Sequence, residues 1–389
     1  MIGLGGTTIF MKIGDEIQEV VPKLLRKYNV PGISLSIIHA DGESYNYNYG
    51  YVDKKNKDLV HTFTRFQVAS VSKPITAWGI LKLVEDKMLD LDSHAVEYIK
   101  KWRLPESDYH NNITIRQILS HTAGLSVSGY YGTTTRNSGF NIVDSLMGKA
   151  RTKERVYVKQ NPSERFDYSG GGYSILQLII EEITGMSFSD FMYVHILSPL
   201  GMSNSTFNPD RMGDVILTSG HDAFGKRLPH RYYVEQAAAG LYTTSQDLTK
   251  FMIANMRQDR VDSILNPLLQ PSTIKLMHTR IRRDIPYGLG FSVNTINKTR
   301  IVSHRGANMG WQSIISMVPD KGIGIVILTN SNNGCNVIHE LMEIWFRDQV
   351  NASLSEFNKK LMNIQKRHPI SIKFVEKWQM ITHQLNMKK

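Results

Sequence analysis

The chain has 389 residues, of which 41% are hydrophobic and 21% are charged, and none of its apolar runs approaches the ~18–20 residues that cross a bilayer. These values exclude a membrane-spanning protein and indicate a soluble globular one with a sizeable core. The formal net charge is +11, but residues 350–389 hold eight Lys or Arg against two Glu and so supply six of those charges. Because the rest of the chain is only mildly basic, we expect no nucleic-acid partner.

Cysteine and histidine usage argues against disulfides and metals. Cys335 is the only cysteine, which excludes an internal disulfide, and the thirteen histidines form no His-Glu-x-x-His motif. We therefore predict neither a metal nor another cofactor.

The first ten residues carry no basic leader before a long apolar core, so the sequence as given predicts no secretory signal and a cytoplasmic location. A truncated sequence of an exported protein would look the same, and the compartment stays open.

An amphipathic helix and a β-hairpin are predicted at the start of the chain. Residues 14–28 place apolar side chains at helical spacing, with Pro22 inside the run. Two apolar or alternating runs, 33–38 and 44–51, flank an Asp-Gly pair at 41–42, which is typical of a tight hairpin turn. An antiparallel sheet is therefore expected to begin here.

The strongest chemical signal is Ser70-Val71-Ser72-Lys73 at the start of a predicted helix. Pro74 fits only in a first turn, and apolar side chains follow at three-and-four spacing, as on a helix that buries one stripe: Ile75, Trp78, Leu81, Val84 and Met88. That spacing puts Lys73 beside Ser70, where an amine with a lowered pKa can take the hydroxyl proton. Unpaired N–H groups at the helix N-terminus could hold an acyl oxyanion. Ser70 is thus a candidate nucleophile and Lys73 its candidate base.

A Ser-x-x-Lys tetrad alone is weak evidence, because the chain has a second one at Ser272 and Lys275. Ser272 follows Gln270-Pro271 there, which is more typical of the cap of a surface helix. The catalytic interpretation of Ser70 therefore depends on partners further along the chain.

The segment that follows the Ser70 helix is predicted to combine short helices with long loops. A helix at 113–119, capped near Thr114, leads into a small-residue loop with His121, to which we assign a structural role rather than that of a base. Residues 126–158 lack a clear period, and we interpret them as a long loop or lid with one helix near 141–148. Such a loop is a candidate for shaping substrate choice.

Tyr168 precedes three glycines, Gly170 to Gly172, and a strongly apolar helix. The glycines match neither Gly-x-Gly-x-x-Gly nor a P-loop, so we interpret them as sites of close backbone packing around Tyr168 rather than as a phosphate cradle. Further on, a small-residue loop at 237–243 joins a helix capped by Thr244, with Asp247 at capping-box spacing.

From residue 287 the pattern changes to strands. The strands are expected at 290–296, 301–304, 312–318 and 324–329, followed by a closing helix at 336–346. The sheet begun near residue 33 is thus expected to be completed near 330, around a mostly helical middle. The predicted fold class is α/β (α+β): an antiparallel sheet flanked by helices, with an inserted mostly helical region.

His304-Arg305-Gly306 is the only His-x-Gly in the chain and is expected at a strand end. Together with Ser70/Lys73 and Tyr168, in this order, it resembles the serine β-lactamase and penicillin-binding protein superfamily, specifically the class C β-lactamase-like hydrolases. The resemblance covers about residues 14–347 and includes Val30-Pro31-Gly32, Gly50-Tyr51-Val52-Asp53, the run from Leu119 to Leu125, Pro199-Leu200-Gly201-Met202, and the run from Gly240 to Thr244.

The resemblance implies an active site between a sheet region, at about 14–66 and 285–347, and a helical region at about 67–284. It implies that Ser70 is the acylated nucleophile, that Lys73 is its base, and that Tyr168 is the catalytic tyrosine. It places His304 where many members carry the lysine of Lys-Thr-Gly. Backbone N–H groups of Ser70 and Ala307, next to Gly306, would form the oxyanion hole. We expect Lys73 and a protonated His304 to favour the Tyr168 phenolate.

Two substrate-binding expectations accompany this resemblance. Many members carry asparagine two residues after the tyrosine, whereas this chain has Gly170, which predicts a wider, less polar pocket and less efficient β-lactam hydrolysis. Arg305 is a candidate for attracting a substrate carboxylate, with an outward-pointing strand residue as the equal alternative.

The basic segment at 350–389 lies beyond the region of resemblance. Its apolar residues fall at helical spacing with lysines between them, which predicts helices that pack on the body or on a second subunit. A basic amphipathic surface that meets a membrane or an anionic polymer is the alternative.

The predicted function is a metal-independent serine hydrolase that forms an acyl-enzyme with an ester or amide, of the esterase or D-amino-acid peptidase or amidase type. Its partner would be a small-molecule or peptide substrate. The alternative is a non-catalytic member that binds cell-wall peptide or assembles with itself, with an intact fold that no acylating probe labels.

Overall fold

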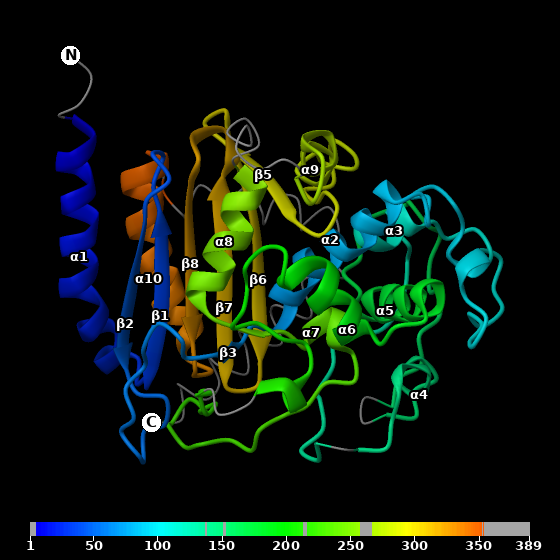
Figure 1. Cartoon of the computed structure of the whole chain (residues 1–389), viewed down its shortest axis with the longest axis horizontal. Coiled ribbons are helices and arrows are strands. Elements are labelled where there is room, and N and C mark those ends of the chain that lie inside the picture. The colour runs from blue at the N-terminus through cyan, green and yellow to red at the C-terminus, as the bar shows by residue number, and fades with distance from the viewer. Residues whose placement is uncertain are drawn as a thin grey trace.

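A six-stranded antiparallel sheet forms the centre of the molecule, with strand order β2-β1-β8-β7-β6-β5 (Figure 1). The computed structural model describes residues 5–351 and 353, apart from 137, 151–152, 213–215, 257–266 and 352. The strands of the sheet are β1 (Gly32–Ile38), β2 (Ser44–Gly50), β5 (Ser292–Ile296), β6 (Thr299–Asn308), β7 (Trp311–Val318) and β8 (Ile323–Thr329). The predicted fold class is confirmed, since the first hairpin joins strands that come from the far end of the chain.

The turns between these strands contain residues that favour the backbone conformation of a turn. Gly42, between β1 and β2, has a φ of +98°, and Asn297 and Lys298, between β5 and β6, both adopt left-handed φ values of 46° and 64°. Positive φ at both central residues is typical of a two-residue hairpin. Between β7 and β8 the short helix Pro319–Lys321 ends at Gly322, whose φ is +65°.

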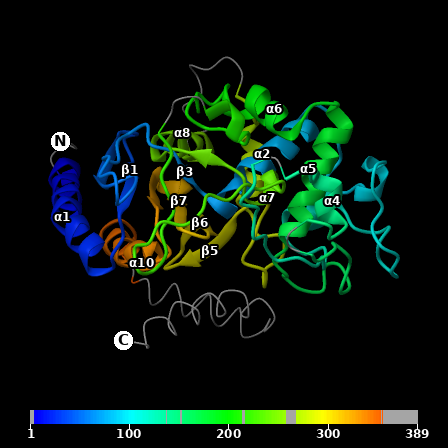
Figure 2. The same ribbon diagram turned by 90° about the horizontal axis from the view of Figure 1, so that it is seen from below.

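Helices cover both faces of the sheet. Helices α1 (Gly5–Lys27) and α10 (Gly334–Trp345) pack together on one face, and α8 (Ser245–Met256) packs on the other (Figure 2). Every residue of β1, β7 and β8 is buried, which is typical of strands that are covered on both sides. Two separate apolar clusters result, one on each face.

A helical region lies beyond the β5–β6 end of the sheet (Figure 1). Its helices are α2 (Ser72–Glu85), α3 (Ile115–Leu119), α4 (Ile142–Leu146), α5 (Gly170–Thr184), α6 (Phe188–Met192), α7 (Gln236–Ala239) and α9 (Pro271–Met277). The shorter turns of helix are Ala69–Val71, Ala95–Tyr98, Tyr193–Leu197, Pro209–Met212 and, after α10, Phe346–Val350. Two short strands, β3 (Phe66–Gln67) and β4 (Tyr242–Thr243), pair antiparallel where this region meets the sheet.

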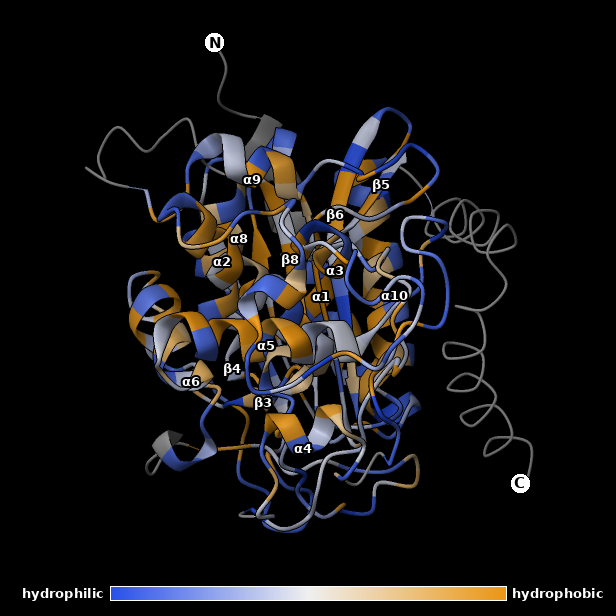
Figure 3. Ribbon diagram, turned by 90° about the vertical axis from the view of Figure 1, so that its right-hand side faces the viewer, coloured by the Kyte–Doolittle hydropathy of each residue, from blue (hydrophilic) through white to orange (hydrophobic). Residues whose placement is uncertain are grey.

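Helix α2 is buried more completely than the sequence predicted. Its residues from Ser72 to Leu81 are all buried, so the helix is buried on all sides and not only along the one apolar stripe that was predicted. Hydrophobic residues follow α2 and α5 as well as the strands (Figure 3). Met88, predicted to belong to the buried stripe, lies beyond the end of the helix and is 46% exposed. A helix that is surrounded on all sides holds its N-terminal residues in fixed positions.

Two further predictions need a change of detail. Gln270, not Ser272, occupies the N-cap position of α9, so that Ser272 lies within the first turn and is exposed. The strand that carries His304 does not end there but continues to Asn308, where it still pairs with Trp311.

The predicted helices of the basic segment at 350–389 lie outside the described residues, except for 350, 351 and 353. Among the described residues, none of the helices is long and apolar enough to cross a bilayer.

Candidate active site

Ser70 lies in a single turn of 3-10 helix between β3 and α2 and is partly exposed. The preceding residue, Ala69, is buried and has a φ of +48°, a conformation that costs a non-glycine residue roughly 1–3 kcal/mol and persists only where its surroundings fix it. Here the hydroxyl of Ser72 donates to the carbonyl of Ala69 at 2.6 Å, and Ser313 donates to the carbonyl of Val68 at 2.8 Å. The strained turn therefore presents Ser70 at a defined position.

Lys73 lies directly beside this serine. Its Nζ is 3.1 Å from the Oγ of Ser70 and donates to the carbonyl of Ala238 at 2.7 Å. The side chain is 1% exposed, and burial lowers the pKa of Lys73 to about 7. The amine is thus neutral in a large share of molecules near neutral pH, within hydrogen-bond reach of the hydroxyl.

Tyr168 closes the other side of the serine. Its phenol interacts with Ser70, and Lys73 Nζ lies 5.0 Å from the centroid of its ring. Burial raises the pKa of Tyr168, and the hydrogen bond to Ser70 opposes only part of that rise. Tyr168 is therefore a neutral phenol here. The predicted phenolate is wrong, because removal from water outweighs the stabilisation that the hydrogen bond from Ser70 gives to the charged form.

His121 has the structural role predicted for it, and the segment that it holds is the one that carries Tyr168. Its Nδ1 accepts from the backbone N–H of Ser169 at 3.1 Å, its carbonyl accepts from the N–H of Asp167 at 2.8 Å, and its ring lies 4.2 Å from that of Tyr168, centroid to centroid. Because Nδ1 is an acceptor, the proton of this neutral ring lies on Nε2, which has no partner among the described residues. Burial, together with Lys73, holds the pKa of His121 well below its usual value.

His304 comes from β6 and is also neutral. Its Nδ1 lies 2.8 Å from the carbonyl of Arg305, which can only accept, so Nδ1 carries the proton. Its Nε2 then accepts from the hydroxyl of Tyr287 at 3.0 Å. Burial, and after it the nearby Lys73, lower the pKa of His304 to about 3. The expectation of a protonated His304 is wrong, because a buried imidazole beside an amine does not hold a second positive charge.

Tyr287 is a site residue that the sequence analysis missed. It is 4% exposed, and its ring lies 5.3 Å from Phe166 and 5.0 Å from His121. The pairing of the strands could have indicated Tyr287. Ser292 of β5 pairs with Ser303 of β6, and Tyr287 forms an antiparallel bridge with Ser292. Counting along the hairpin places the segment that begins at Tyr287 beside the strand that carries His304.

Gly306 is the point at which β6 meets the serine turn. A Cβ atom at this position would lie 2.0 Å from the carbonyl oxygen of Val68 and 3.1 Å from the backbone nitrogen of Ser70. No other residue fits there without moving one of the two segments. Ala307 follows it in the strand and pairs with Gln312 of β7. Gly306 thus lies next to the candidate nucleophile, and the oxyanion role of Ala307 stays a prediction.

Arg305 does not point into the site. Successive side chains of a strand face opposite ways, and His304, Gly306 and Asn308 are buried on the Ser70 side whereas Arg305 and Ala307 are exposed on the other. Arg305 interacts there with Cys335 of α10. The prediction that Arg305 attracts a substrate carboxylate is therefore wrong, and the alternative, an outward-pointing strand residue, is what the structure has.

The space next to Gly170 is filled rather than open. A Cβ atom on Gly170 would lie 3.2 Å from the ring of Tyr130 and 3.3 Å from the carbonyl oxygen of Ser128. Tyr130 is held by a hydrogen bond of 2.7 Å between its hydroxyl and that of Ser174. The predicted wider pocket is wrong, because an aromatic ring from the lid occupies the room that glycine leaves.

The chemistry of this cluster is that of a nucleophile beside a neutral amine. In the part of the chain that the structure describes, no group of three or more His, Cys, Asp or Glu side chains is arranged to hold a metal ion. Ser70, Lys73, Tyr168 and His304 come from three distant segments and meet in one place. Such an arrangement can transfer the serine proton to the lysine and form a covalent intermediate.

Solved structures share this combination of sheet and helical insertion. A class C β-lactamase superposes with a TM-score of 0.68 over 85% of this chain and 96% of that chain, at 23% identity, which shows a shared fold. The octameric penicillin-binding protein homologue from Pyrococcus abyssi superposes with a TM-score of 0.70 over 82% of this chain and 74% of that chain, at 25% identity. Fold and site therefore define a protein of the β-lactamase/transpeptidase type.

The chain belongs to the Beta-lactamase family, whose sequence model matches residues 17–340. Protein flp of Staphylococcus aureus strain MW2 is 27% identical over 333 residues, which cover 82% of this chain and 63% of that protein. The chain thus spans less than two thirds of the length of this relative. The predicted resemblance to the superfamily is confirmed.

Proposed function

We propose that the protein is a serine hydrolase that forms an acyl-enzyme at Ser70 with an ester or amide substrate. The observation that carries this proposal is the buried Lys73, whose Nζ lies 3.1 Å from the Ser70 hydroxyl and whose pKa is lowered by burial to about 7. A serine hydroxyl becomes a useful nucleophile only when a base accepts its proton, and a desolvated lysine can be that base.

In the proposed acylation step, the neutral Lys73 amine takes the proton of Ser70 while Oγ forms a bond to the substrate carbonyl carbon. The carbonyl electron pair moves onto oxygen, where the backbone N–H groups of Ser70 and Ala307 stabilise it, an effect worth about 3–4 kcal/mol per donor. When the intermediate collapses, the bond to the leaving group breaks and the lysine proton passes to that group, with the neutral phenol of Tyr168 as the relay.

In the proposed deacylation step, water attacks the acyl-serine ester and Lys73 again takes the proton. The acid product leaves and the Ser70 hydroxyl is restored. His304 supplies no charge in this scheme. It borders the site as a neutral ring that Tyr287 holds.

We propose substrates of the esterase or D-amino-acid peptidase or amidase type in preference to β-lactams. The support is position 170, where glycine itself offers no side-chain amide and the ring of Tyr130 lies against it. An acyl group that carries an amide would lack the hydrogen-bonding partner that an asparagine side chain offers at this position. An acyl group without an amide needs no such partner.

The test is mass spectrometry of the intact protein and of its peptides after incubation with a fluorophosphonate and, separately, with a penicillin. We expect the first reagent to modify Ser70 and the second to leave little adduct. Ser70→Ala should abolish the modification, and Ser272→Ala, in the exposed second tetrad, should leave it unchanged. Stable labelling or rapid turnover of the penicillin would shift the substrate class to β-lactams. Labelling by neither reagent would contradict the hydrolase and favour a non-catalytic member that binds cell-wall peptide or assembles with itself.

A further inference from the structure

Helix α7 ends in three backbone carbonyl groups that accept from buried side chains of other elements. The carbonyls belong to residues 237, 238 and 239. The Thr76 hydroxyl donates to the first at 3.0 Å, Lys73 Nζ donates to the second at 2.7 Å, and the Asn308 amide donates to the third at 3.4 Å. Thr76 and Asn308 take no part in the proposed acylation, so that scheme leaves their bonds to α7 without a role.

These carbonyls are available because α7 is a single turn. The last carbonyl groups of a helix have no partner within it. The N–H of Leu241 would bond to the carbonyl of Ala237 if the helix continued, but it donates to the hydroxyl of Ser72 at 3.0 Å. The end of α7 is therefore fixed by hydrogen bonds to its neighbours rather than by bonds within the helix.

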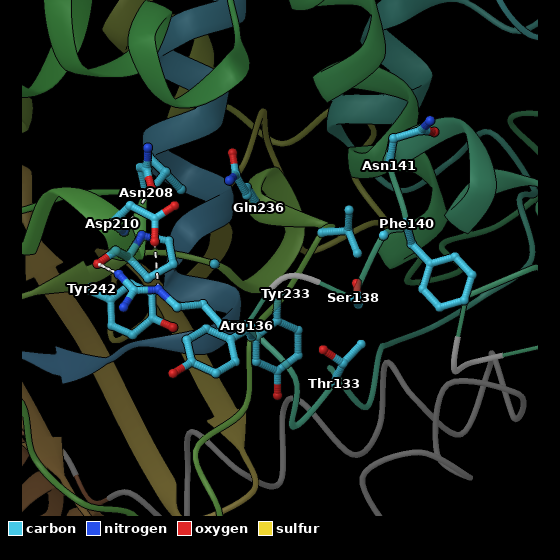
Figure 4. Close-up of a pocket in the computed structure, with 16 residues that line it drawn as sticks. Thr133, Arg136, Ser138, Phe140, Asn141, Asn208, Asp210, Tyr233, Gln236 and Tyr242 are labelled. Atoms are coloured by element: carbon cyan, nitrogen blue, oxygen red, sulfur yellow. Dashed lines mark hydrogen bonds and ion pairs between the residues drawn. The ribbon is translucent and has the colours of Figure 1, made fainter.

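The two sides of α7 face different surroundings. Gln236 lines a pocket of about 430 Å³, whereas the three alanines at 237–239 do not line it and are at most 8% exposed (Figure 4). The small side chain of alanine lets the backbone of α7 come close to α2. The carbonyls of these residues therefore meet side chains of α2 and β6 directly.

The carbonyl of Ala238 decides how a neutral Lys73 amine is turned. Such an amine has two N–H groups and one lone pair, and a carbonyl oxygen can only accept, so one N–H points to Ala238. The faces of the Tyr168 and Tyr173 rings, whose centroids lie 5.0 and 5.5 Å from Nζ, favour an N–H over a lone pair. The lone pair is then left for the Ser70 hydroxyl, 3.1 Å from Nζ.

Thr76 fixes this carbonyl from the same helix that carries the proposed base. It lies three residues after Lys73 in α2, and residues at this spacing share a helix face. Their side chains bond to adjacent carbonyls of α7, so the direction of one carbonyl depends on the other being held. Thr76 is 0% exposed, and a buried hydroxyl is normally hydrogen-bonded, here to Ala237. Asn308 holds the third carbonyl from β6.

We propose that Thr76 is a positioning residue for acylation, because its bond to α7 keeps the neighbouring carbonyl where it turns the lone pair of Lys73 toward Ser70. The inference rests on the proposed acylation of Ser70 and adds a residue that acts through α7, without contact with the substrate. It predicts that the Thr76 hydroxyl matters for proton transfer and not for substrate binding.

The rate is tested with Thr76→Val, which removes the hydroxyl and keeps the shape of the side chain. We expect the plateau rate of Ser70 labelling by a fluorophosphonate to fall about tenfold, and Thr76→Ser, which keeps the donor, to stay within about threefold of the unmodified protein. With p-nitrophenyl acetate, burst-phase kinetics should show a lower acylation rate constant and an unchanged dissociation constant.

Thr249→Val in α8 is the matched control. Thr249 is 4% exposed, and its hydroxyl donates to the carbonyl of Ser245 at 2.9 Å, so the substitution removes the same kind of buried donor elsewhere. It should leave the labelling rate unchanged. If Thr76→Val fails to fold, Thr76→Ala removes the same donor with a smaller side chain, and the same results are expected of it.

A second measurement shows whether the effect passes through Lys73. Carbon-13 NMR of the lysine Cε atoms follows its titration, with Lys73→Gln to assign the signal. A carbonyl acceptor favours the charged form of an amine, so we expect Thr76→Val to lower the pKa of Lys73 by about 0.5 or more. Loosened packing that admits water would instead raise this pKa toward the usual ~10.4.

The titratable groups that face Lys73 do not disturb this measurement. Burial holds the pKa of His121 and of His304 well below the usual value, and it raises the pKa of Tyr168 and of Tyr173. All four groups are neutral between about pH 5 and pH 9. A titration in this range therefore reports the lysine itself.

The outcomes separate the two proposals. A slower rate together with a lower pKa of Lys73, both restored by Thr76→Ser, supports the positioning role. An unchanged rate in Thr76→Val, or a slower rate with an unchanged or raised pKa of Lys73, overturns it. If the fluorophosphonate does not label the unmodified protein, the hydrolase is contradicted and the titration alone decides: a lowered pKa in Thr76→Val supports the positioning of the amine, and an unchanged or raised one overturns it.

Discussion

At the scale of single residues, the burial of Lys73 decides which group can act as the base. A lysine with the usual pKa of ~10.4 is neutral in fewer than about one molecule in a thousand at pH 7, whereas a pKa of about 7 makes half of the amines neutral. His121 and His304 are neutral as well, so they add no positive charge beside Tyr168. The proposed mechanism therefore depends on one amine whose proton affinity is set by desolvation.

The pH dependence of acylation should follow this amine. We expect the rate of Ser70 modification by a fluorophosphonate to be low at pH 5, to rise through an apparent pKa near 7 and to level off above pH 8. The sign follows from the lysine, which must lose its proton before it can accept that of Ser70. A stopped-flow or quenched labelling series checks this, and a rate that falls as the pH rises through 7 would exclude Lys73 as the base.

Tyr287→Phe should change the titration of His304. The Tyr287 hydroxyl donates to Nε2 of the neutral ring, so its removal takes a partner from the neutral form and raises the pKa of His304. Nitrogen-15 NMR of the histidine rings measures this, with His304→Gln to assign the signal. In the unmodified protein the ring should stay neutral, with its proton on Nδ1, down to about pH 4. An identical titration in both proteins would show that Tyr287 does not hold this ring.

At the scale of secondary-structure elements, the approach of β6 to the Ser70 turn is the contact that builds the site. The strand continues past Gly306 because its pairing with β7 extends to Asn308, and only glycine lets the backbone pass the carbonyl of Val68. Helix α7 also contacts this turn from the helical region, and the carbonyl of its Ala238 accepts from Lys73 at the start of α2. The site is thus assembled where a strand, a helix and a strained turn meet.

Gly306→Ala should separate these elements. A methyl group cannot share the space of a backbone carbonyl, so we expect a loss of about 1–3 kcal/mol in unfolding free energy and at least a tenfold slower labelling of Ser70. Arg305→Ala, on the opposite face of the same strand, is the matched control and should keep the rate. Urea unfolding and the labelling assay measure the two effects. Equal rates for both variants would show that the close approach of β6 does not matter for Ser70.

At the scale of the whole molecule, the sheet separates two apolar cores with different tasks. The cluster on the α2 and α8 side surrounds the site, whereas the cluster under α1 and α10 lies on the far face. The second core should therefore support stability without shaping the chemistry.

Leu341→Ala should show this division. Leu341 is 1% exposed in α10, and removal of such a side chain costs about 2–5 kcal/mol. We expect a lower midpoint of thermal unfolding and, in the protein that remains folded at 25 °C, an unchanged rate of Ser70 labelling. Leu276→Ala, at a position 38% exposed in α9, is the control and should leave both nearly unchanged. Slower labelling in folded Leu341→Ala would show that the two cores are coupled.

Much of the architecture could be predicted from local signals. The Asp-Gly turn, the alternating runs and the capping of α3 by Thr114 each depend on neighbouring residues, and the structure has them where they were expected. Ser70 and Lys73 could be paired because helical spacing fixes their distance. The division at about 67 and 285 stays a prediction.

What could not be predicted depends on contacts between distant segments. The neutrality of His304 follows from burial and from Tyr287, and neither is visible in the His-x-Gly motif. The ring of Tyr130 beside Gly170 comes from a lid without periodicity, so an absent side chain was mistaken for an open space. The outward direction of Arg305 depends on a strand register that extends beyond the predicted end.

The most direct test of the central claim is rapid-quench mass spectrometry of the protein during hydrolysis of a p-nitrophenyl ester at pH 8. We predict an intermediate heavier by the acyl group, with the added mass on the peptide that contains Ser70, and no such species in Ser70→Ala. Turnover that continues in Ser70→Ala, or an acyl group found on Ser272 or any other residue instead, would contradict the account.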